Sequence, residues 1–180
     1  MNRSISIAAS ILGLTFSAAA GAQSVRAYAD IQSCTDTPVS GRMVLVERAS
    51  EEGVKVVDVM LRVKGLPDGR HAVHLHEVGT CMPCGDAKGH FDPGPAGMSS
   101  PDGNHPYHSG DLINIDIKNG EGIMQTLTSR VTLSPGPLSV FDDDGSAVII
   151  HVDPDSYCPE GEAKGCAGGA RAACGVIDRP

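Results

Sequence analysis

Short runs of β-branched or alternating residues, separated by turn-forming dipeptides, constrain the fold of this chain more than any other feature. The runs lie at residues 43–46, 54–63 and 71–76. Because successive side chains of a strand point to opposite faces, such runs are typical of strands packed on a core. The dipeptides between apolar runs are Glu52-Gly53, Asp68-Gly69, Asn119-Gly120 and Asp144-Gly145. Asn-Gly or Asp-Gly in this position is a strong hairpin signal, so we predict hairpins there.

Many short strands and no convincing amphipathic helix after residue 22 predict an all-β sandwich or barrel. Residues 25–152 are expected to be mainly β-structure, interrupted by one long segment without strand patterning at residues 77–110. A second such segment follows at residues 153–170. Long irregular loops in a compact domain are usually functional, so we expect the functional groups on these two loops.

The first 22 residues resemble a secretory signal peptide, and residues 23–180 are expected to form one domain. Arg3 supplies a positive charge, residues 5–20 are mostly apolar, and Ala20-Gly21-Ala22 has the small residues of a cleavage site. An N-terminal membrane anchor is the alternative, but the run is short of a membrane span and no second apolar run follows. We therefore predict an exported protein, periplasmic or extracellular, that is not embedded in a membrane.

The charge balance argues against polyanionic partners. The chain has 14 basic and 22 acidic residues, with a net charge of −8. Arg3 is the only charged residue in the leader, so its removal leaves 13 basic residues against 22 acidic ones, a net charge of −9. Such a domain repels nucleic acid and anionic lipid at long range, and neither is expected as a partner.

The six cysteines all follow the leader, and in an oxidising compartment an even number predicts up to three disulfides. Fifteen complete pairings are possible. A zinc ribbon would require two close cysteine pairs at ligand spacing. Cys81 and Cys84 form one such pair, but Cys158 and Cys166 lie too far apart to form the other. We therefore favour disulfides over a zinc ribbon.

Six of the seven histidines lie between His71 and Asp111. Residues two apart in a strand share one face, so His74 and His76 would present two imidazoles side by side. His90, His105 and His108 follow in a segment with no apolar periodicity. Imidazole clusters suit copper and zinc, whereas the acid-rich oxygen sets that calcium prefers are missing. The sequence therefore predicts a histidine-rich metal centre.

Several motifs occur in an order similar to that of one known family. They are His71, His74-Leu75-His76-Glu77, Gly79-Thr80-Cys81, Gly89-His90-Phe91-Asp92-Pro93, His108-Ser109-Gly110-Asp111-Leu112, Asp144-Gly145-Ser146 with His151, and residues 169–177 around Arg171. The chain resembles the copper/zinc superoxide dismutases in the form that bacteria secrete. The resemblance implies a Greek-key β-sandwich or flattened barrel of about eight antiparallel strands. It also implies dismutation of superoxide to oxygen and hydrogen peroxide by a redox-cycling copper.

The resemblance also implies roles for single residues. The copper ligands would be His74, His76, His90 and His151. His90 would bridge to zinc, and Arg171 would guide the superoxide anion. Asp155 matches an aspartate that accepts hydrogen bonds from metal-bound histidines, although the adjacent Asp153 is an alternative by charge. His71 matches a structural histidine that is not a ligand.

The zinc ligands implied by the resemblance are His90, His108 and Asp111, and here the chain departs from the family. The family places its remaining zinc histidine eight residues after the bridging one, and that position holds Met98. Methionine is a poor zinc ligand. His105 is a candidate replacement, and a solvent-exposed loop histidine is the other interpretation of the same residue. Zinc occupancy is therefore an open question at this point.

The resemblance further implies a disulfide between Cys81 and Cys174, with Cys84 as the competitor for Cys174. Cys158 and Cys166 could form a separate local bridge. The alternative function is a non-catalytic, exported copper-binding or copper-delivery module on the same scaffold. Arg171 favours the enzyme, because a copper carrier has no use for a cation beside an open copper position. A homodimer is compatible with the sequence, which contains no decisive patch.

Overall fold

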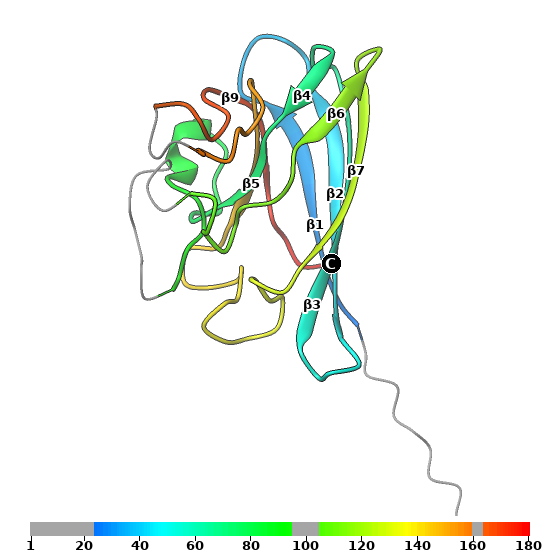
Figure 1. The fold of residues 1–180 in the computed structure, drawn as a ribbon, viewed down its shortest axis with the longest axis vertical. Coiled ribbons are helices and arrows are strands. Elements are labelled where there is room, and N and C mark those ends of the chain that lie inside the picture. The colour runs from blue at the N-terminus through cyan, green and yellow to red at the C-terminus, as the bar shows by residue number, and fades with distance from the viewer. Residues whose placement is uncertain (1–23, 95–104, 160–163) are drawn as a thin grey trace, which may run out of the picture.

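The computed structural model describes residues 24–94, 105–159 and 164–180. Within them the regular structure is nine strands and one short 3₁₀ helix (Figure 1). The strands are β1 (Val25–Ser33), β2 (Ser40–Ala49), β3 (Lys55–Lys64), β4 (Gly69–His71), β5 (Val73–His76), β6 (Ile115–Lys118), β7 (Glu121–Thr128), β8 (Ala147–His151) and β9 (Arg171–Val176), and the helix is η1 (Cys84–Ala87). Every strand pair is antiparallel.

The sheet is nearly closed, because its two outer strands are one interrupted stretch of chain. The strand order is β4-β6-β7-β3-β2-β1-β9-β8-β5. Only Ala72 separates β4 from β5. At Ala72 the backbone bonds to Asp153 and His151 instead of to β6. About eight strands were expected, and counting the interrupted stretch once reconciles that number with the nine observed. Closure also removes the exposed edges of an open sheet.

The connections have Greek-key character. β1, β2 and β3 are sequential neighbours, as are β6 with β7 and β8 with β9. The chain then passes from β3 to β4 and from β7 to β8, two pairs that are not neighbours in the sheet. The predicted all-β barrel is therefore confirmed. Figure 1 shows η1 and the irregular segments gathered on the β5 side of the barrel, away from β2, β3 and β7.

Two of the four predicted hairpins are present. Asn119 and Gly120 join β6 to β7 with φ angles of 54° and 75°, and positive φ at both positions defines the type I′ turn that suits a two-residue hairpin. Gly53, with φ of 79°, lies in the connection between β2 and β3. The other two predictions are wrong. Asp68-Gly69 lies at the start of β4 and Asp144-Gly145 precedes β8, and neither strand pairs with the strand before it.

Strands β5 and β8, which carry His74, His76 and His151, are buried on both faces. β2 and β3 alternate between buried and more exposed residues, whereas every residue of β5 and β8 is buried. Val148 and Ile150 of β8 pack in the barrel core. Ala147 and Ile149 belong instead to a second apolar cluster that includes Cys81 and Ala87 of the first long loop. The loop therefore covers the outer face of β8 and creates a buried layer outside the barrel.

A third long irregular segment was not anticipated. Residues 129–146, expected to be β-structure, contain only an isolated bridge between Thr132 and Ser139. Val131, Leu133 and Val140 of this segment are buried in the barrel core. Their apolar character therefore reflects core packing by an irregular segment and not a strand.

The described residues contain three disulfides, which pair all six cysteines. They are Cys34–Cys84, Cys81–Cys174 and Cys158–Cys166. The last two are the pairs put forward from the sequence. Cys84, the suggested competitor for Cys174, is joined to Cys34 instead. The expected signal peptide and Met98 lie outside the described residues. In the part of the chain that is described, no helix has the length and apolar character needed to cross a membrane.

Candidate metal centre

The metal centre is built on the outer face of β5 and β8. Val73 and Leu75 of β5 pack in the barrel core, so strand alternation turns His74 and His76 to the other face. This is the shared face predicted from their spacing. β5 pairs with β8, whose last residue is His151. The buried layer beneath the loops thus receives three imidazoles from two neighbouring strands.

The first long loop adds His90 by running beside β5. His76 and His90 form an isolated β-bridge, and the Phe91 amide donates to the Leu75 carbonyl at 2.8 Å. Gly110 closes the same contact, because its amide donates to Phe91 and its carbonyl accepts from Leu75. A Cβ on Gly110 would lie 2.4 Å from the Leu75 carbonyl oxygen, so only glycine allows this approach. Backbone pairing, rather than loop sequence alone, therefore fixes His90 beside His76.

These four histidines form a group able to hold a metal ion. The ligating atoms of His74, His76, His90 and His151 all lie within 4.8 Å of one another, and all four residues are buried. In the described structure, His76 Nε2 and His90 Nε2 are buried without a hydrogen-bond partner. His74 Nδ1 lies 3.2 Å from His151 Nε2, two ring nitrogens facing each other. Buried polar atoms normally have a partner, so the convergence of these nitrogens indicates a site suited to a metal cation.

The second ring nitrogen of each histidine is held by the protein. His76 Nδ1 donates to the Lys88 carbonyl and His151 Nδ1 to the Gly169 carbonyl, both at 3.0 Å. His74 Nε2 lies 3.1 Å from Asp155 Oδ2. Such contacts fix the direction and tautomer of each imidazole, which leaves the other nitrogen available as a ligand.

Burial and the surrounding charges favour the neutral form of three of these imidazoles. Burial, together with the neighbouring imidazoles and Arg171, lowers the pKa of His76 well below its usual value. Burial lowers the pKa of His90 to about 4 even though Asp111 opposes the shift. Burial and His74 lower the pKa of His151 to about 3. Neutral imidazole is the form that binds a metal.

A second group lies on the other side of His90. It comprises His74, His90, His105 and Asp111, all buried. Asp111 is at its centre, with Oδ1 2.7 Å from His90 Nδ1 and Oδ2 3.1 Å from both His105 Nδ1 and His108 Nδ1. Burial would raise the pKa of Asp111, but hydrogen bonds with the three histidines outweigh it and lower that pKa strongly. The structure thus brings together every described residue expected at the zinc site, including His105.

Asp155 connects the two groups. Its Oδ2 lies 3.1 Å from His74 Nε2 and 2.8 Å from His105 Nε2. Within the described residues, the alternative Asp153 forms no hydrogen bond or ion pair with a histidine of the metal centre, and its backbone bonds to Ala72 and Gly168. Burial would lower the pKa of His105, but hydrogen bonds with Asp111 and Asp155 raise it to about 9. His105 is therefore a buried partner of two carboxylates and not a solvent-exposed loop residue.

Asn114 is a residue beside the metal centre that sequence reasoning missed. Its Nδ2 donates to the Asp155 carbonyl at 3.0 Å, and its Oδ1 accepts from the Asp155 amide at 2.7 Å. The two bonds clamp the backbone of Asp155 from one side chain. The only signal in the sequence is an amide between Ile113 and Ile115 at the start of a strand, which by itself indicates nothing about Asp155.

Arg171 opens β9 and lies opposite His151 in the sheet register. Its Nη1 and Nη2 donate to the carbonyls of Cys84 and Lys88. The Cys34–Cys84 disulfide ties one of these acceptors to the chain just beyond β1, and Cys174 of β9 is tied to Cys81. His71, the expected structural histidine, belongs to neither group. Its Nδ1 lies 2.8 Å from the carbonyl oxygen of His151, and its Nε2 lies 2.9 Å from that of Pro67.

Comparison with known proteins agrees with this arrangement. Residues 39–177 match the family model described as copper/zinc superoxide dismutase (SODC). Superoxide dismutase (Cu-Zn) 2 of Aquifex aeolicus is 39% identical over 165 residues, covering 86% of this chain and 88% of that protein. Superoxide dismutase (Cu-Zn) 1 of the same organism is 35% identical over 165 residues, covering 87% and 89%. The Deinococcus radiodurans enzyme is 35% identical over 136 residues, covering 66% and 69%.

Two solved structures share the fold. The clock protein EA4 has a TM-score of 0.69 and 26% identity, covering 94% of this chain and 100% of that chain. A double mutant of a SOD-like protein from Bacillus subtilis has a TM-score of 0.61 and 27% identity, covering 83% and 95%. Residues 39–177 include strands β2 to β9 and both histidine groups. The chain therefore belongs to the copper/zinc superoxide dismutase family.

Proposed function

We propose that this chain dismutates superoxide to oxygen and hydrogen peroxide with copper held by His74, His76, His90 and His151. One observation carries the proposal: four buried imidazoles converge, with one ring nitrogen of each within 4.8 Å of the others. An all-nitrogen set of this kind suits copper. Copper bound there would supply the one-electron chemistry that oxidises one superoxide and reduces the next.

The chain's own contribution to the reaction is to hold an anion beside the metal. The mature chain would carry a net charge of −9, so its overall field opposes the approach of superoxide. Arg171 supplies a local cation. A guanidinium has five N–H donors, and the contacts with Cys84 and Lys88 engage only two of its nitrogens. Arg171 can therefore be oriented by the two carbonyls and still donate to an anion, without taking part in proton transfer.

For zinc, we propose the ligand set His90, His108, Asp111 and His105. His105 would replace the histidine that the family has at the position of Met98. The support is the contact of His105 Nε2 with Asp155, which leaves Nδ1 facing Asp111 at 3.1 Å. Three nitrogens and one carboxylate oxygen form a plausible four-coordinate zinc site. Zinc there would hold the loop against β5 and supply the second cation on His90.

The zinc proposal is tested by metal analysis of the purified protein and of His105→Ala. Copper and zinc are counted per chain after loading with both. We expect one zinc per wild-type chain and a loss of zinc, with copper retained, in His105→Ala. Equal zinc contents in the two proteins would show that His105 is not a ligand. Zinc well below one per chain in the wild type would show that the site is weakened despite His105.

The enzyme is distinguished from a copper-binding or copper-delivery module by Arg171→Ile. The matched control is Arg62→Ile, which removes an exposed arginine from β3. We expect Arg171→Ile to keep its copper but to dismutate superoxide about tenfold or more slowly, because a cation that attracts and binds the anion is removed. Its rate should also depend less on ionic strength than that of the wild type. The control should match the wild type. An unchanged rate in Arg171→Ile, or no dismutation by the copper-loaded wild type, would leave the non-catalytic module as the better explanation.

We further propose that the protein acts outside the cytoplasm, in the periplasm or beyond. Three disulfides and the bacterial relatives support an exported protein. Cleavage after Ala22 would start the mature chain at Gln23. N-terminal sequencing of the exported protein tests this directly, and recovery of Met1 in a membrane fraction would contradict it. Sedimentation of the mature protein distinguishes a monomer from a homodimer.

A further inference from the structure

Arg130 is an exposed arginine that bonds to backbone carbonyls instead of to a carboxylate. It lies just beyond β7, near the start of the irregular segment 129–146. Among the described residues it forms no ion pair, whereas Arg42 pairs with an aspartate of β1. Its Nη1 donates to the Pro106 carbonyl at 3.3 Å, and its Nη2 donates to the Asp111 carbonyl. One side chain therefore joins the third irregular segment to the loop that carries the second histidine group.

The two carbonyls lie at the ends of a stretch that supplies ligands to the proposed zinc site. His105 directly precedes Pro106, and Asp111 is itself a proposed ligand. Inside the stretch, the Asp111 amide donates to the His108 carbonyl at 3.2 Å, and the His108 amide donates to Asp111 Oδ2 at 3.0 Å. Arg130 closes the same stretch from outside. The side chains of His105 and Asp111, which approach to 3.1 Å, thus extend from a turn whose two ends share one guanidinium.

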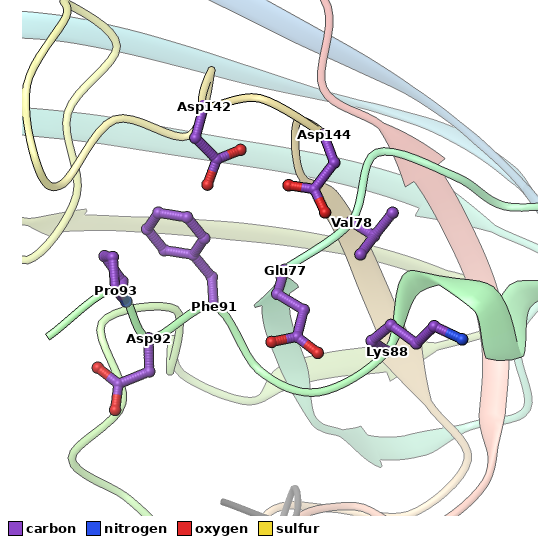
Figure 2. A pocket seen from close by; sticks show the side chains of 8 residues that line it. All are labelled: Glu77, Val78, Lys88, Phe91, Asp92, Pro93, Asp142 and Asp144. Atoms are coloured by element: carbon purple, nitrogen blue, oxygen red, sulfur yellow. The ribbon is translucent and has the colours of Figure 1, made fainter. Parts of the chain in front are cut away.

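The Asp111 end of this stretch is attached to the barrel through its own backbone. The neighbouring Gly110 donates its amide to Phe91 at 2.7 Å and accepts from the Leu75 amide at 2.9 Å. Phe91 is buried, and Figure 2 shows its ring on the side of Asp142, at a surface hollow of about 500 Å³. Backbone bonds to β5 and a buried ring therefore fix the position of Asp111.

The Pro106 end has no such attachment in the part of the chain that the structure describes. Proline has no backbone N–H, and the bond from Arg130 is the only hydrogen bond to the Pro106 carbonyl within those residues. The preceding His105 is held by its ring, with Nε2 2.8 Å from Asp155 Oδ2 and Nδ1 3.1 Å from Asp111 Oδ2. The position of His105 thus depends on these ring contacts and on Arg130, which holds the next residue.

Arg130 is itself anchored on the barrel. Its amide donates to Thr128 Oγ1 at 3.1 Å, and the side chains of Val131 and Leu133 are fully buried in the core. The Leu133 amide donates to the buried carboxylate of Glu47 in β2 at 2.5 Å. A guanidinium is planar and presents its N–H groups as a rigid fork, so two carbonyls bonded to it are held at a set separation. Arg130 can therefore hold the Pro106 carbonyl at a fixed place relative to the barrel.

We infer that Arg130 is a positioning residue for the proposed zinc site. By holding the carbonyls of Pro106 and Asp111, it brings the ring of His105 to the carboxylate of the same aspartate. There His105 takes the place of the ligand that the family has at the position of Met98. A histidine that arrives from a later point of the loop requires the loop to be held at that point, and Arg130 holds it. The inference rests on the zinc ligands of the proposed function.

The test measures zinc binding by the mature protein with copper already bound to the first group. Arg130→Met removes every donor at a similar side-chain length, and Arg130→Lys keeps the charge but offers one nitrogen instead of a fork. Arg62→Met is the matched control, because Arg62 is an exposed arginine of β3. Zinc affinity is determined by titration against a competing chelator. Cobalt(II) is then bound in place of zinc, because its visible absorption is more intense in a four-coordinate site than in a six-coordinate one.

We expect Arg130→Met to weaken zinc binding by about tenfold or more, the effect typical of losing a group that orients a metal ligand. Arg130→Lys should lose less than Arg130→Met, and Arg62→Met should bind zinc as tightly as the wild type. At saturation, the cobalt absorption of Arg130→Met should be weaker than that of the wild type, because fewer sites hold all four protein ligands. An unchanged zinc affinity in Arg130→Met, or an equal loss in Arg62→Met, would refute the role of Arg130.

A double-mutant cycle tests whether Arg130 acts through His105. Arg130→Met is introduced into His105→Ala, and the zinc affinity is measured again. Removal of Arg130 should cost about tenfold when His105 is present and much less when it is absent, because there is then no ring to position. A loss by the same factor in both backgrounds would refute the inference, because the effect would not pass through His105.

Thermal unfolding separates a loss of positioning from a loss of structure. Because Arg130 is exposed, the metal-free Arg130→Met protein should melt close to the metal-free wild type. The rise in melting temperature on adding zinc should be smaller for the variant, because zinc stabilises the folded state according to its affinity. Equal rises would refute the inference and leave the proposed zinc site standing. If the wild type binds no zinc, or if His105→Ala binds it equally well, the proposed zinc ligands fail, and the inference fails with them.

Discussion

Removal of the Cys34–Cys84 disulfide should weaken both the fold and the orientation of Arg171. The perturbation is the double substitution Cys34→Ser and Cys84→Ser, which leaves no free thiol to pair elsewhere. Cys84 is 9% exposed, so serine fits its space. The carbonyl of Cys84 accepts from Arg171, and this disulfide connects that carbonyl to the chain just beyond β1. We therefore expect two separate effects, one on stability and one on the rate of dismutation.

The stability effect follows from the length of the closed loop. The two cysteines are 50 residues apart. In the chain-entropy treatment a loop of this length stabilises the folded state by about 4 kcal/mol at 25 °C. For a domain of this size, that corresponds to a melting temperature lower by about 8–16 °C. Cys158 and Cys166 are only 8 residues apart, and the same relation yields about 2.5 kcal/mol for that bridge. The double serine variant of Cys158 and Cys166 is thus a control with a smaller expected loss.

The assay is guanidinium unfolding of the metal-free proteins, read as the free energy of unfolding. Metal is removed so that ligand binding does not add to the stability of the folded state. The reasoning is refuted if the Cys34/Cys84 variant loses no more than the Cys158/Cys166 variant. The effect on Arg171 is measured on the copper-loaded proteins. Removal of Cys34–Cys84 should lower the rate at unchanged copper content, and a full rate would show that the η1 carbonyl stays in place without the disulfide.

Two further predictions concern single side chains. Glu47 accepts from the Ser134 amide at 2.9 Å and from its hydroxyl at 2.6 Å, and these hydrogen bonds outweigh burial and lower its pKa. A carboxylate whose pKa is lowered by folding stabilises the folded state above its unfolded pKa, near 4.3. In urea unfolding, Glu47→Gln should therefore lower the free energy of unfolding by about 1–3 kcal/mol at pH 7 and by less at pH 3. A loss of the same size at both pH values would contradict this. Asn114→Ala removes both hydrogen bonds to the Asp155 backbone, so it should weaken zinc binding by about tenfold or more. An unchanged zinc affinity in a titration would show that Asn114 does not support the site through Asp155.

Local geometry made part of this structure predictable from the sequence. The two-residue period of a strand placed His74 and His76 on one face, whatever the rest of the chain did. The preference of Asn-Gly for positive φ placed the turn between β6 and β7 at Asn119 and Gly120. Both inferences depend on interactions within a few residues.

The failed hairpins depended on interactions between distant residues. Asp68-Gly69 and Asp144-Gly145 have the same turn chemistry as the successful pair, but the strands on either side of them pair elsewhere in the barrel. The apolar residues of segment 129–146 likewise fill the core without entering the sheet. Turn chemistry permits a hairpin, whereas strand pairing across the whole sheet decides whether it forms.

The sequence by itself determined the all-β class, the paired imidazoles and the types of residue at the metal centre, but not the extent of every strand. Only the tertiary structure decided that His105 meets Asp155, 50 residues away, that Asn114 clamps the same aspartate, and that Cys34 pairs with Cys84. These contacts join loops to each other outside the barrel. No periodicity relates residues in such loops, and their meeting is fixed by closure of the sheet and by backbone bonds to β5, which bury the outer face and bring distant side chains together.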